Sequence, residues 1–237
     1  MKKDEIRRIL EEIDVLLLLA ASGERERRIF AWQMFVWGSY VFFNMTLWLL
    51  FPDLTRKVPG SLWFHTMFVA FYFSTVQFAG WFRSLIWVGA YLLSVLAFYL
   101  STPIVAVATT IVSITVSSLL VYGALRGKAG GGRMPITGYV GMVWGILFAS
   151  FWWNFVLHGD AFSDEVFNLW ITYVFGTGIL LSGVIFRRFF LLGLFILFGL
   201  PLLARFGDPY LFWGYDLSAL TMAVMGITLY LKDDRRA

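Results

Sequence analysis

Long apolar stretches separated by short polar interruptions fill the chain from residue 29 to residue 231. An apolar run of 18 or more residues is typical of a membrane-spanning helix, because about 20 residues at 1.5 Å each cross the hydrocarbon core of a bilayer. The stretch from 29 to 51 is long enough for one such helix and is followed by Pro52. We therefore predict an all-α fold made of membrane-spanning helices.

Two longer apolar regions, 61–126 and 166–231, each have room for three spans, and 136–158 has room for one more. Turns that divide the longer regions are predicted near residues 80–83, 101–103, 187–188 and 205–209. The pattern thus predicts a polytopic membrane protein of about eight transmembrane helices.

Residues 2–21 have a different pattern, in which Ile6, Ile9, Leu10 and Ile13 recur at helical spacing among charged residues. This pattern predicts an amphipathic helix whose apolar part is too short to span a bilayer. We expect it to end at Ser22 and Gly23, and residues 1–28 to form a cytoplasmic surface helix with a charged boundary. Such a helix would lie on the lipid bilayer or dock a cytoplasmic protein partner.

The Gly-rich and basic segment 127–135 is predicted to be a cytoplasmic linker between two four-span halves, 29–126 and 136–231, with a cytoplasmic tail at 232–237. Similar residues interrupt the apolar stretches of the two halves: Asp53 aligns with Asp160, Arg83 with Arg187, and Pro103 with Pro209. Two parallel four-helix repeats would produce this match. Any series of hydrophobic helical hairpins would also show interruptions at similar spacing, without a duplication. Both explanations stay open.

Charge predicts the orientation. If the N-terminus is cytoplasmic, all basic residues except Arg56, Lys57 and Arg205 lie on the cytoplasmic side, as the positive-inside rule requires. Hydrophobic residues make up 59% of the chain and charged residues 14%, a composition that argues against a soluble domain. We expect a multi-pass protein of the plasma membrane. The net charge of +4 is explained by topology, and no nucleic-acid partner is expected.

Asp216 is the main candidate for chemistry, because its predicted place is about 10 Å along the last span from the outer end. Carboxylates at such depth often mark proton or ion routes. Thr110, Ser113 and Ser117 form a hydroxyl stripe on the fourth span, and Thr110 takes the place of Asp216 when the halves are aligned. Together these residues are a candidate transport or proton site. The structural alternatives are that Asp216 pairs with hydroxyls or Arg205, and that the stripe bonds its own helix.

Small residues predict close helix packing, within the chain or in a homodimer. They are Gly138, Gly141 and Gly145 on the fifth span and Gly178 on the sixth.

Other chemistry has little support. The chain has no cysteine, and it contains no catalytic motif, so neither an enzyme nor a cofactor is predicted. His65 and His158 are both expected near the outer surface, but two ligands without a supporting motif do not predict a metal or haem.

Three functional classes therefore remain, of which an integral-membrane enzyme or haem protein that uses the outer histidines is the least favoured. The first is a small transporter or permease coupled to protons or cations through Asp216. The alternative is a non-catalytic membrane subunit or sensor that docks a cytoplasmic partner through its N-terminal helix.

Overall fold

The computed structural model describes residues 3–51, 62–126, 143–147, 150, 153–154, 164–183 and 185–234. Every regular element among them is a helix, which confirms the predicted all-α class. The main helices are α1 (Lys3–Leu50), α3 (Leu62–Ala79), α4 (Trp81–Ser84), α5 (Ile86–Leu100), α6 (Pro103–Arg126), α8 (Asp164–Ser182), α9 (Arg187–Leu194), the π-helix η2 (Phe195–Gly199), α10 (Leu200–Ala204) and α11 (Asp208–Asp234).

Membrane spanning is supported by 4 of the described segments, which are long and apolar enough to cross a bilayer. They cover 81–100, 103–121, 187–204 and 209–232. α1 and α3 are not among these segments, although both pack in the same bundle. The total of about eight spans, the linker 127–135 and the internal repeat stay predictions, since residues 127–142 and most of 148–163 lie outside the described part.

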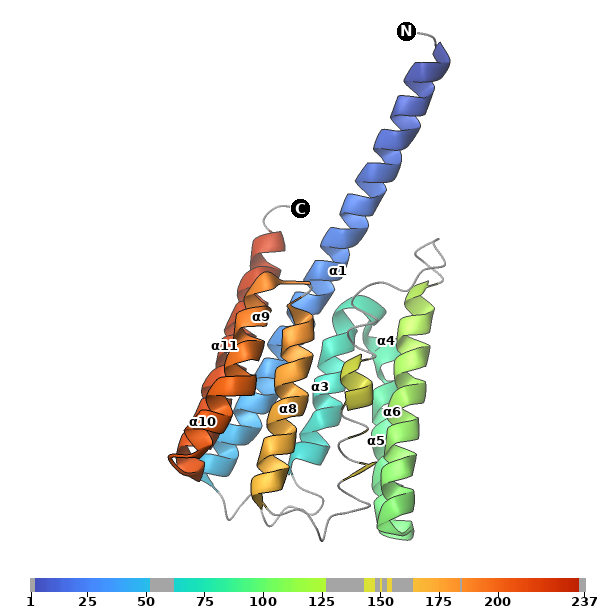
Figure 1. Cartoon of the computed structure of the whole chain (residues 1–237). Coiled ribbons are helices and arrows are strands. Elements are labelled where there is room, and N and C mark those ends of the chain that lie inside the picture. The colour runs from blue at the N-terminus through green and yellow to red at the C-terminus, as the bar shows by residue number, and fades with distance from the viewer. Residues whose placement is uncertain are drawn as a thin grey trace.

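The predicted end of the first helix at Ser22 and Gly23 is wrong. α1 is one continuous helix of 48 residues, so the segment predicted to be amphipathic and the segment predicted to be the first span form a single element. A glycine inside a helix costs only about 1 kcal/mol relative to alanine, and the Glu and Arg residues that follow Gly23 are good helix formers. At 1.5 Å per residue α1 is roughly 70 Å long, and Figure 1 shows it extending past the ends of the other helices.

The predicted turns agree well with the helix boundaries. α3 ends beside Gly80 and α10 ends before Gly207, and both glycines have positive φ, of 84° and 114°, which residues with a side chain rarely adopt. Pro103 begins α6, where its missing N–H removes no helical hydrogen bond. Pro201 cannot donate to the carbonyl four residues earlier, and the wider π turn η2 accommodates it there.

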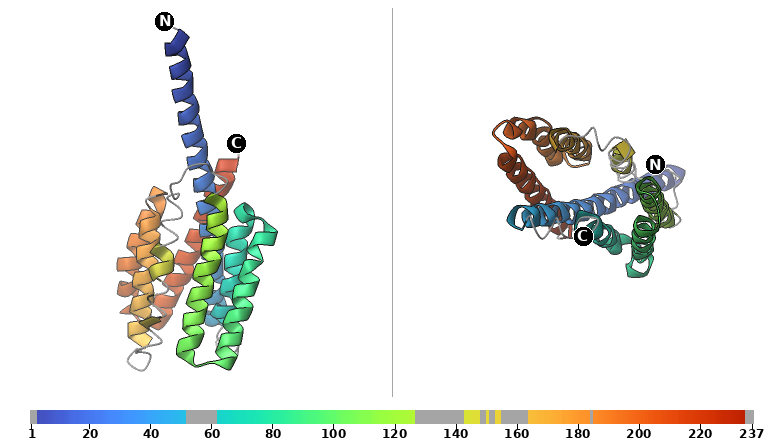
Figure 2. Two further views of the ribbon diagram at one scale, coloured as in Figure 1. Left: turned by 90° about the vertical axis from the view of Figure 1, so that its right-hand side faces the viewer. Right: turned by 90° about the horizontal axis from the view of Figure 1, so that it is seen from below.

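α1 lies at the centre of the arrangement. It packs on α11 along most of the bundle and on α3 from another side. α5 pairs with α6, whereas α8 packs on α9 and η2. Figure 2 shows α1 between these two groups of helices. Two separate clusters of buried side chains follow the same division, one around α1, α8, α9 and α11 and one around α3, α5 and α6.

The contact between α1 and α11 brings backbone against backbone. A Cβ placed on Gly38 of α1 would lie 2.5 Å from the amide nitrogen of Ala223 and 2.8 Å from the carbonyl oxygen of Ala219. About one turn away, a Cβ on Gly226 of α11 would lie 2.4 Å from the amide nitrogen of Phe35. Because no side chain fits at either place, these glycines set the close approach of the two helices.

Candidate intramembrane carboxyl site

Asp216 lies on α11, two turns beyond the first residues of the helix. Pro209 stands in the first turn, where proline is favoured because its fixed φ suits the helix and its missing N–H has no partner there. The Asp216 residue is 6% exposed and faces α1. The sequence therefore predicted correctly that the carboxyl group lies inside an apolar helix and away from its end.

Thr46 of α1 is the polar partner of Asp216. Its hydroxyl oxygen lies 3.1 Å from Oδ1 and 3.4 Å from Oδ2, so one O–H group can donate to either carboxylate oxygen. Within the described part of the chain Asp216 has no ion pair, and Arg205 does not contact it. Of the two structural alternatives for Asp216, the hydroxyl partner is therefore present and the arginine pair is absent.

An aromatic pair lies next to this contact. Phe212 precedes Asp216 by one helical turn, and its ring centroid is 4.3 Å from that of Trp48 on α1. Another face of α11 contacts α8, where the hydroxyls of Tyr215 and Thr172 are hydrogen-bonded to each other. The carboxyl group thus lies in the seam between α1 and α11, and the Trp48–Phe212 ring pair joins the same two helices next to it.

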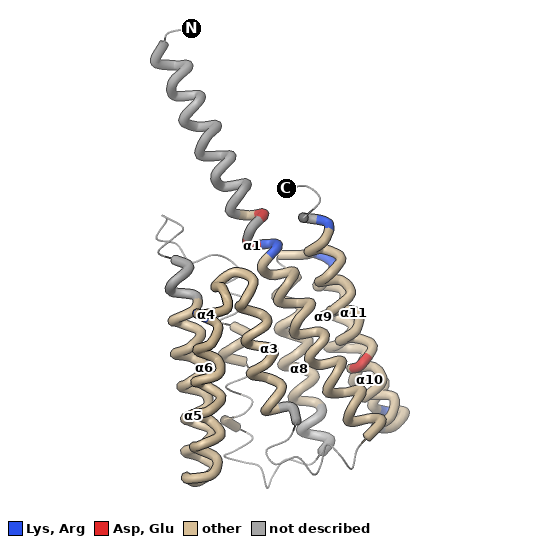
Figure 3. Tube along the Cα trace, turned by 180° about the vertical axis from the view of Figure 1, so that it is seen from behind, with Lys and Arg blue, Asp and Glu red and all other residues tan. Residues whose placement is uncertain are grey.

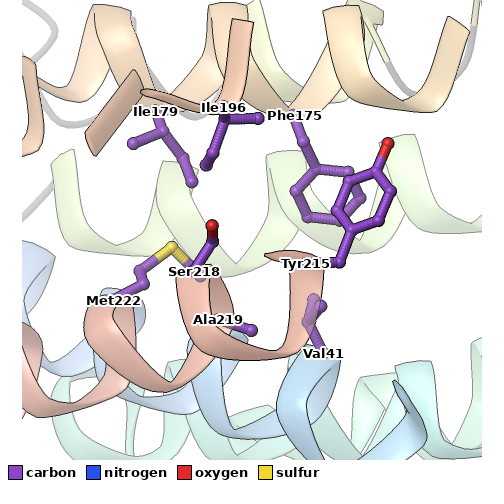
Figure 4. Close-up of a pocket in the computed structure, with 8 residues that line it drawn as sticks. All are labelled: Val41, Phe175, Ile179, Ile196, Tyr215, Ser218, Ala219 and Met222. Atoms are coloured by element: carbon purple, nitrogen blue, oxygen red, sulfur yellow. The ribbon is translucent and has the colours of Figure 1, made fainter. Parts of the chain in front are cut away.

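A small cavity lies beside α11, on a face next to the one that carries Asp216. It has a volume of about 20 Å³, room for roughly one water molecule, and α1, α8, η2 and α11 enclose it. Figure 4 shows its lining side chains, which are Val41, Phe175, Ile179, Ile196, Tyr215, Ser218, Ala219 and Met222. The polar groups of Tyr215 and Ser218 bond to Thr172 and to the Gly214 carbonyl. Asp216 does not line this cavity, which is too small for an organic substrate.

The predicted hydroxyl stripe is buried, but it lies between other helices. Thr110, Ser113 and Ser117 of α6 are all buried. Ser113 shares a hydrogen bond of 3.2 Å with Ser94 of α5, and Thr110 donates to the carbonyl of Ala106 in its own helix. α6 packs on α5 and α3, whereas α11 packs on α1, α10 and α9. The hydroxyl stripe therefore lies between α6 and α5, whereas Asp216 lies between α11 and α1, and the structure does not bring them together.

The small residues have mixed outcomes. Gly178 is packed against the ring of Trp144, since a Cβ there would lie 2.5 Å from two ring carbons, and the Trp144 indole donates to Ser182 at 3.3 Å. A Cβ on Gly145 would meet nothing within 4 Å. Gly145 therefore makes no close helix contact within the described chain. Gly138 and Gly141 lie outside the described residues.

The histidines offer no metal centre in the part of the chain that the structure describes. Nδ1 of His65 is 2.9 Å from the Tyr91 hydroxyl, and no group of three or more potential ligands surrounds it among these residues. His158 lies outside the described residues.

Sequence reasoning missed Thr46 as the partner of Asp216. One signal was available: if the first and last spans are antiparallel neighbours, residues at similar distances from the same membrane face can meet. Thr46 is close to the end of α1, as Asp216 is close to the beginning of α11. Nothing in the sequence, however, indicates that these two helices are neighbours.

Comparison with models of protein families, with curated proteins and with solved structures finds no match to this chain.

Proposed function

We propose that this chain is a small membrane transporter coupled to protons, with Asp216 as the group that takes up and releases the proton. The observation that carries the proposal is a carboxyl group within a spanning segment whose polar partner is one threonine hydroxyl. An ionised carboxylate without a cationic partner is costly in the interior of a bilayer. Binding a proton removes that charge.

Thr46 suits a group that changes its protonation state. A hydroxyl can donate to a carboxylate and can accept from a carboxylic acid. The contact at 3.1 Å can therefore persist in both states with only a rotation of the hydroxyl hydrogen.

The ligand count favours a proton over a metal cation. Hard cations such as Ca²⁺ and Mg²⁺ take about six or more oxygen ligands. Among the described residues, the side-chain oxygens that meet at Asp216 belong to its own carboxyl group and to Thr46. That set is too small to replace the hydration shell of a metal ion.

The distribution of charge supports a cytoplasmic placement of both chain ends. The guanidinium of Arg28 lies 4.9 Å from the ring centroid of Tyr230, and that of Arg27 lies 5.2 Å from the centroid of Phe186. These contacts bring the basic residues of α1, the start of α9 and the end of α11 to one end of the bundle, as Figure 3 illustrates. Arg205 lies between α10 and α11, at the other end. The positive-inside rule assigns the Arg28 end to the cytoplasm.

The test is infrared difference spectroscopy of the full chain in lipid across a range of pH, with Asp216→Asn as the control. We expect a carboxylic-acid stretching band that titrates in the original chain and is missing from the Asp216→Asn variant. Purified protein in liposomes should then carry protons in response to a pH gradient, and the variant should not. A carboxylate that stays ionised at every pH would reject the proposal.

A membrane subunit or sensor is the second candidate, and the continuity of α1 favours it. A continuous helix of roughly 70 Å is about twice as long as the hydrocarbon core is thick. The first turns of α1 can therefore extend into the cytoplasm and bind a partner there. Deleting residues 2–22 tests this role. If a polypeptide that copurifies with the full chain is lost while the bundle keeps its thermal stability, the deleted turns hold a partner. An unchanged set of copurifying proteins would contradict it.

A further inference from the structure

We infer that Asp216 exchanges its proton with the end of the bundle that carries Arg205, past a lid formed by Trp48 and Phe212, and that the route to the Arg28 end is closed. This inference rests on the proposed protonation of Asp216 and adds the side of access to it. In the orientation proposed above, the conformation is outward-facing with a closed lid.

The route toward the Arg28 end is closed by backbone packing. From Asp216 inward, the seam between α1 and α11 passes Gly38 and then Gly226. At Gly38 the backbone of Ala219 and Ala223 already occupies the space of a Cβ, and at Gly226 the backbone of Phe35 does so. At these two places the backbones of α1 and α11 leave no room for a water molecule between them. On α11 this close packing extends from Ala219 to Gly226, about 10 Å at 1.5 Å per residue.

The same end of the seam is also held together by polar contacts. The Arg28 guanidinium donates to the Tyr230 hydroxyl at 3.4 Å and lies over its ring, and the Tyr230 hydroxyl donates to Gln77 of α3 at 3.4 Å. The Trp32 indole donates to the carbonyl of Phe73 at 2.8 Å. Opening this end requires several interactions among three helices to break together.

The route toward the Arg205 end is short. Asp216 lies eight residues after Asp208, the first residue of α11, which corresponds to about 12 Å. Among the residues that the structure describes, the ring pair Trp48 and Phe212 lies in that direction. Side chains on a helix lean toward its N-terminus, so the Asp216 carboxyl leans toward the turn that Phe212 occupies. Rotation of one aromatic side chain is a smaller change than separating two packed backbones.

The absence of cysteine from all 237 residues makes the inference testable by single-cysteine labelling, because each introduced thiol is the only one in the chain. Asp216→Cys is treated in sealed proteoliposomes with a charged, membrane-impermeant methanethiosulfonate. Phe206→Cys, at a residue 68% exposed beside Arg205, and Phe82→Cys, at a residue 73% exposed in α4, mark the two ends. These markers make the test independent of the proposed membrane orientation.

We expect Asp216→Cys to react slowly from the side that labels Phe206→Cys. Adding Trp48→Ala should increase the rate at least tenfold. Adding Trp32→Ala, which removes a tryptophan of the same helix at the other end, should leave the rate unchanged. Trp48→Phe is the milder second variant if Trp48→Ala loses its thermal transition, and an increase of a few-fold is then expected.

Reaction from the side that labels Phe82→Cys would overturn the inference, and so would a rate that neither Trp48 variant increases. These outcomes are separate from those of the infrared titration. If the Asp216 carboxyl titrates but Asp216→Cys is labelled from the Phe82 side, the proposed function is retained and the side of access is rejected. If Asp216→Cys is labelled from the Phe206 side but the Asp216 carboxyl does not titrate, the proposed function is rejected.

Discussion

The Trp87 indole donates to the Thr75 hydroxyl at 3.0 Å, and both residues are only 1% exposed. Thr75 in turn lies 3.1 Å from the hydroxyl of Ser84, and the Trp87 ring stacks on Phe71 at a centroid distance of 4.3 Å. This contact joins α3, α4 and α5 through one buried hydroxyl network. Such a network stabilises a helix bundle in lipid because the surrounding solvent offers no alternative hydrogen-bond partners.

Trp87→Phe should lower the free energy of unfolding by about 1–3 kcal/mol, because it removes the indole donor and leaves a void beside Phe71. Thermal unfolding in a mild detergent measures the loss. Trp81→Phe is the matched control, since Trp81 is 65% exposed and loses no buried contact. Equal stability of the two variants would mean that the Thr75 contact contributes nothing to the bundle.

Much of this fold can be predicted from the sequence. The period and length of the apolar runs predict the helices, and Gly80, Pro103 and Gly207 predict where the chain turns. The depth of Asp216 follows from its distance to Pro209. These features depend on a few consecutive residues, so local physical chemistry is sufficient to predict them.

Helix neighbours cannot be predicted in the same way. In lipid every helix face is apolar, so hydrophobicity does not reveal which faces meet. The partner role of Thr46 and the close approach at Gly38 and Gly226 depend on α1 lying against α11. The continuity of α1 past Gly23 was missed for a different reason: a Ser-Gly pair is a common helix end, but nothing at that place forces the chain to turn.

Gly38→Ala should destabilise the bundle by about 1–3 kcal/mol, because the new methyl group would overlap the backbone of Ala223 and would force α1 and α11 apart. Gly89→Ala is the control, since a Cβ at Gly89 meets nothing within 4 Å. In that open position alanine should stabilise the helix slightly, by roughly 0.5–1 kcal/mol. The midpoint of thermal unfolding for each variant in the same detergent decides the comparison, and a harmless Gly38→Ala would contradict the closed seam.

Thr46 and Asp216 should be energetically coupled. A double-mutant cycle of Thr46→Val and Asp216→Ala is expected to give a coupling free energy of about 0.5–1.5 kcal/mol, typical of hydrogen bonds between helices in lipid. The same cycle with Thr228→Val in place of Thr46→Val should give a value near zero, because the Thr228 hydroxyl donates to carbonyls of its own helix. Unfolding measurements on the single and double variants provide both values. Additive effects at Thr46 and Asp216 would show that their contact at 3.1 Å has no energetic role.

The orientation of the bundle can be decided with reporters of membrane side. A reporter fused after Asp164, at the start of α8, should indicate the outside, and one fused after Lys128 should indicate the cytoplasm. The reason is that α8 runs from Asp164 toward the turn before Arg187, and the basic residues at that turn lie at the same end of the bundle as Arg28. Single cysteines at Ser101 and Phe206, both exposed between helices, should likewise be labelled together from the outer side. Labelling of these two cysteines from opposite sides would rule out the up-and-down arrangement of α5, α6, α10 and α11. A cytoplasmic signal from the reporter after Asp164 would reverse the membrane orientation, and the access of Asp216 would then be from the cytoplasm.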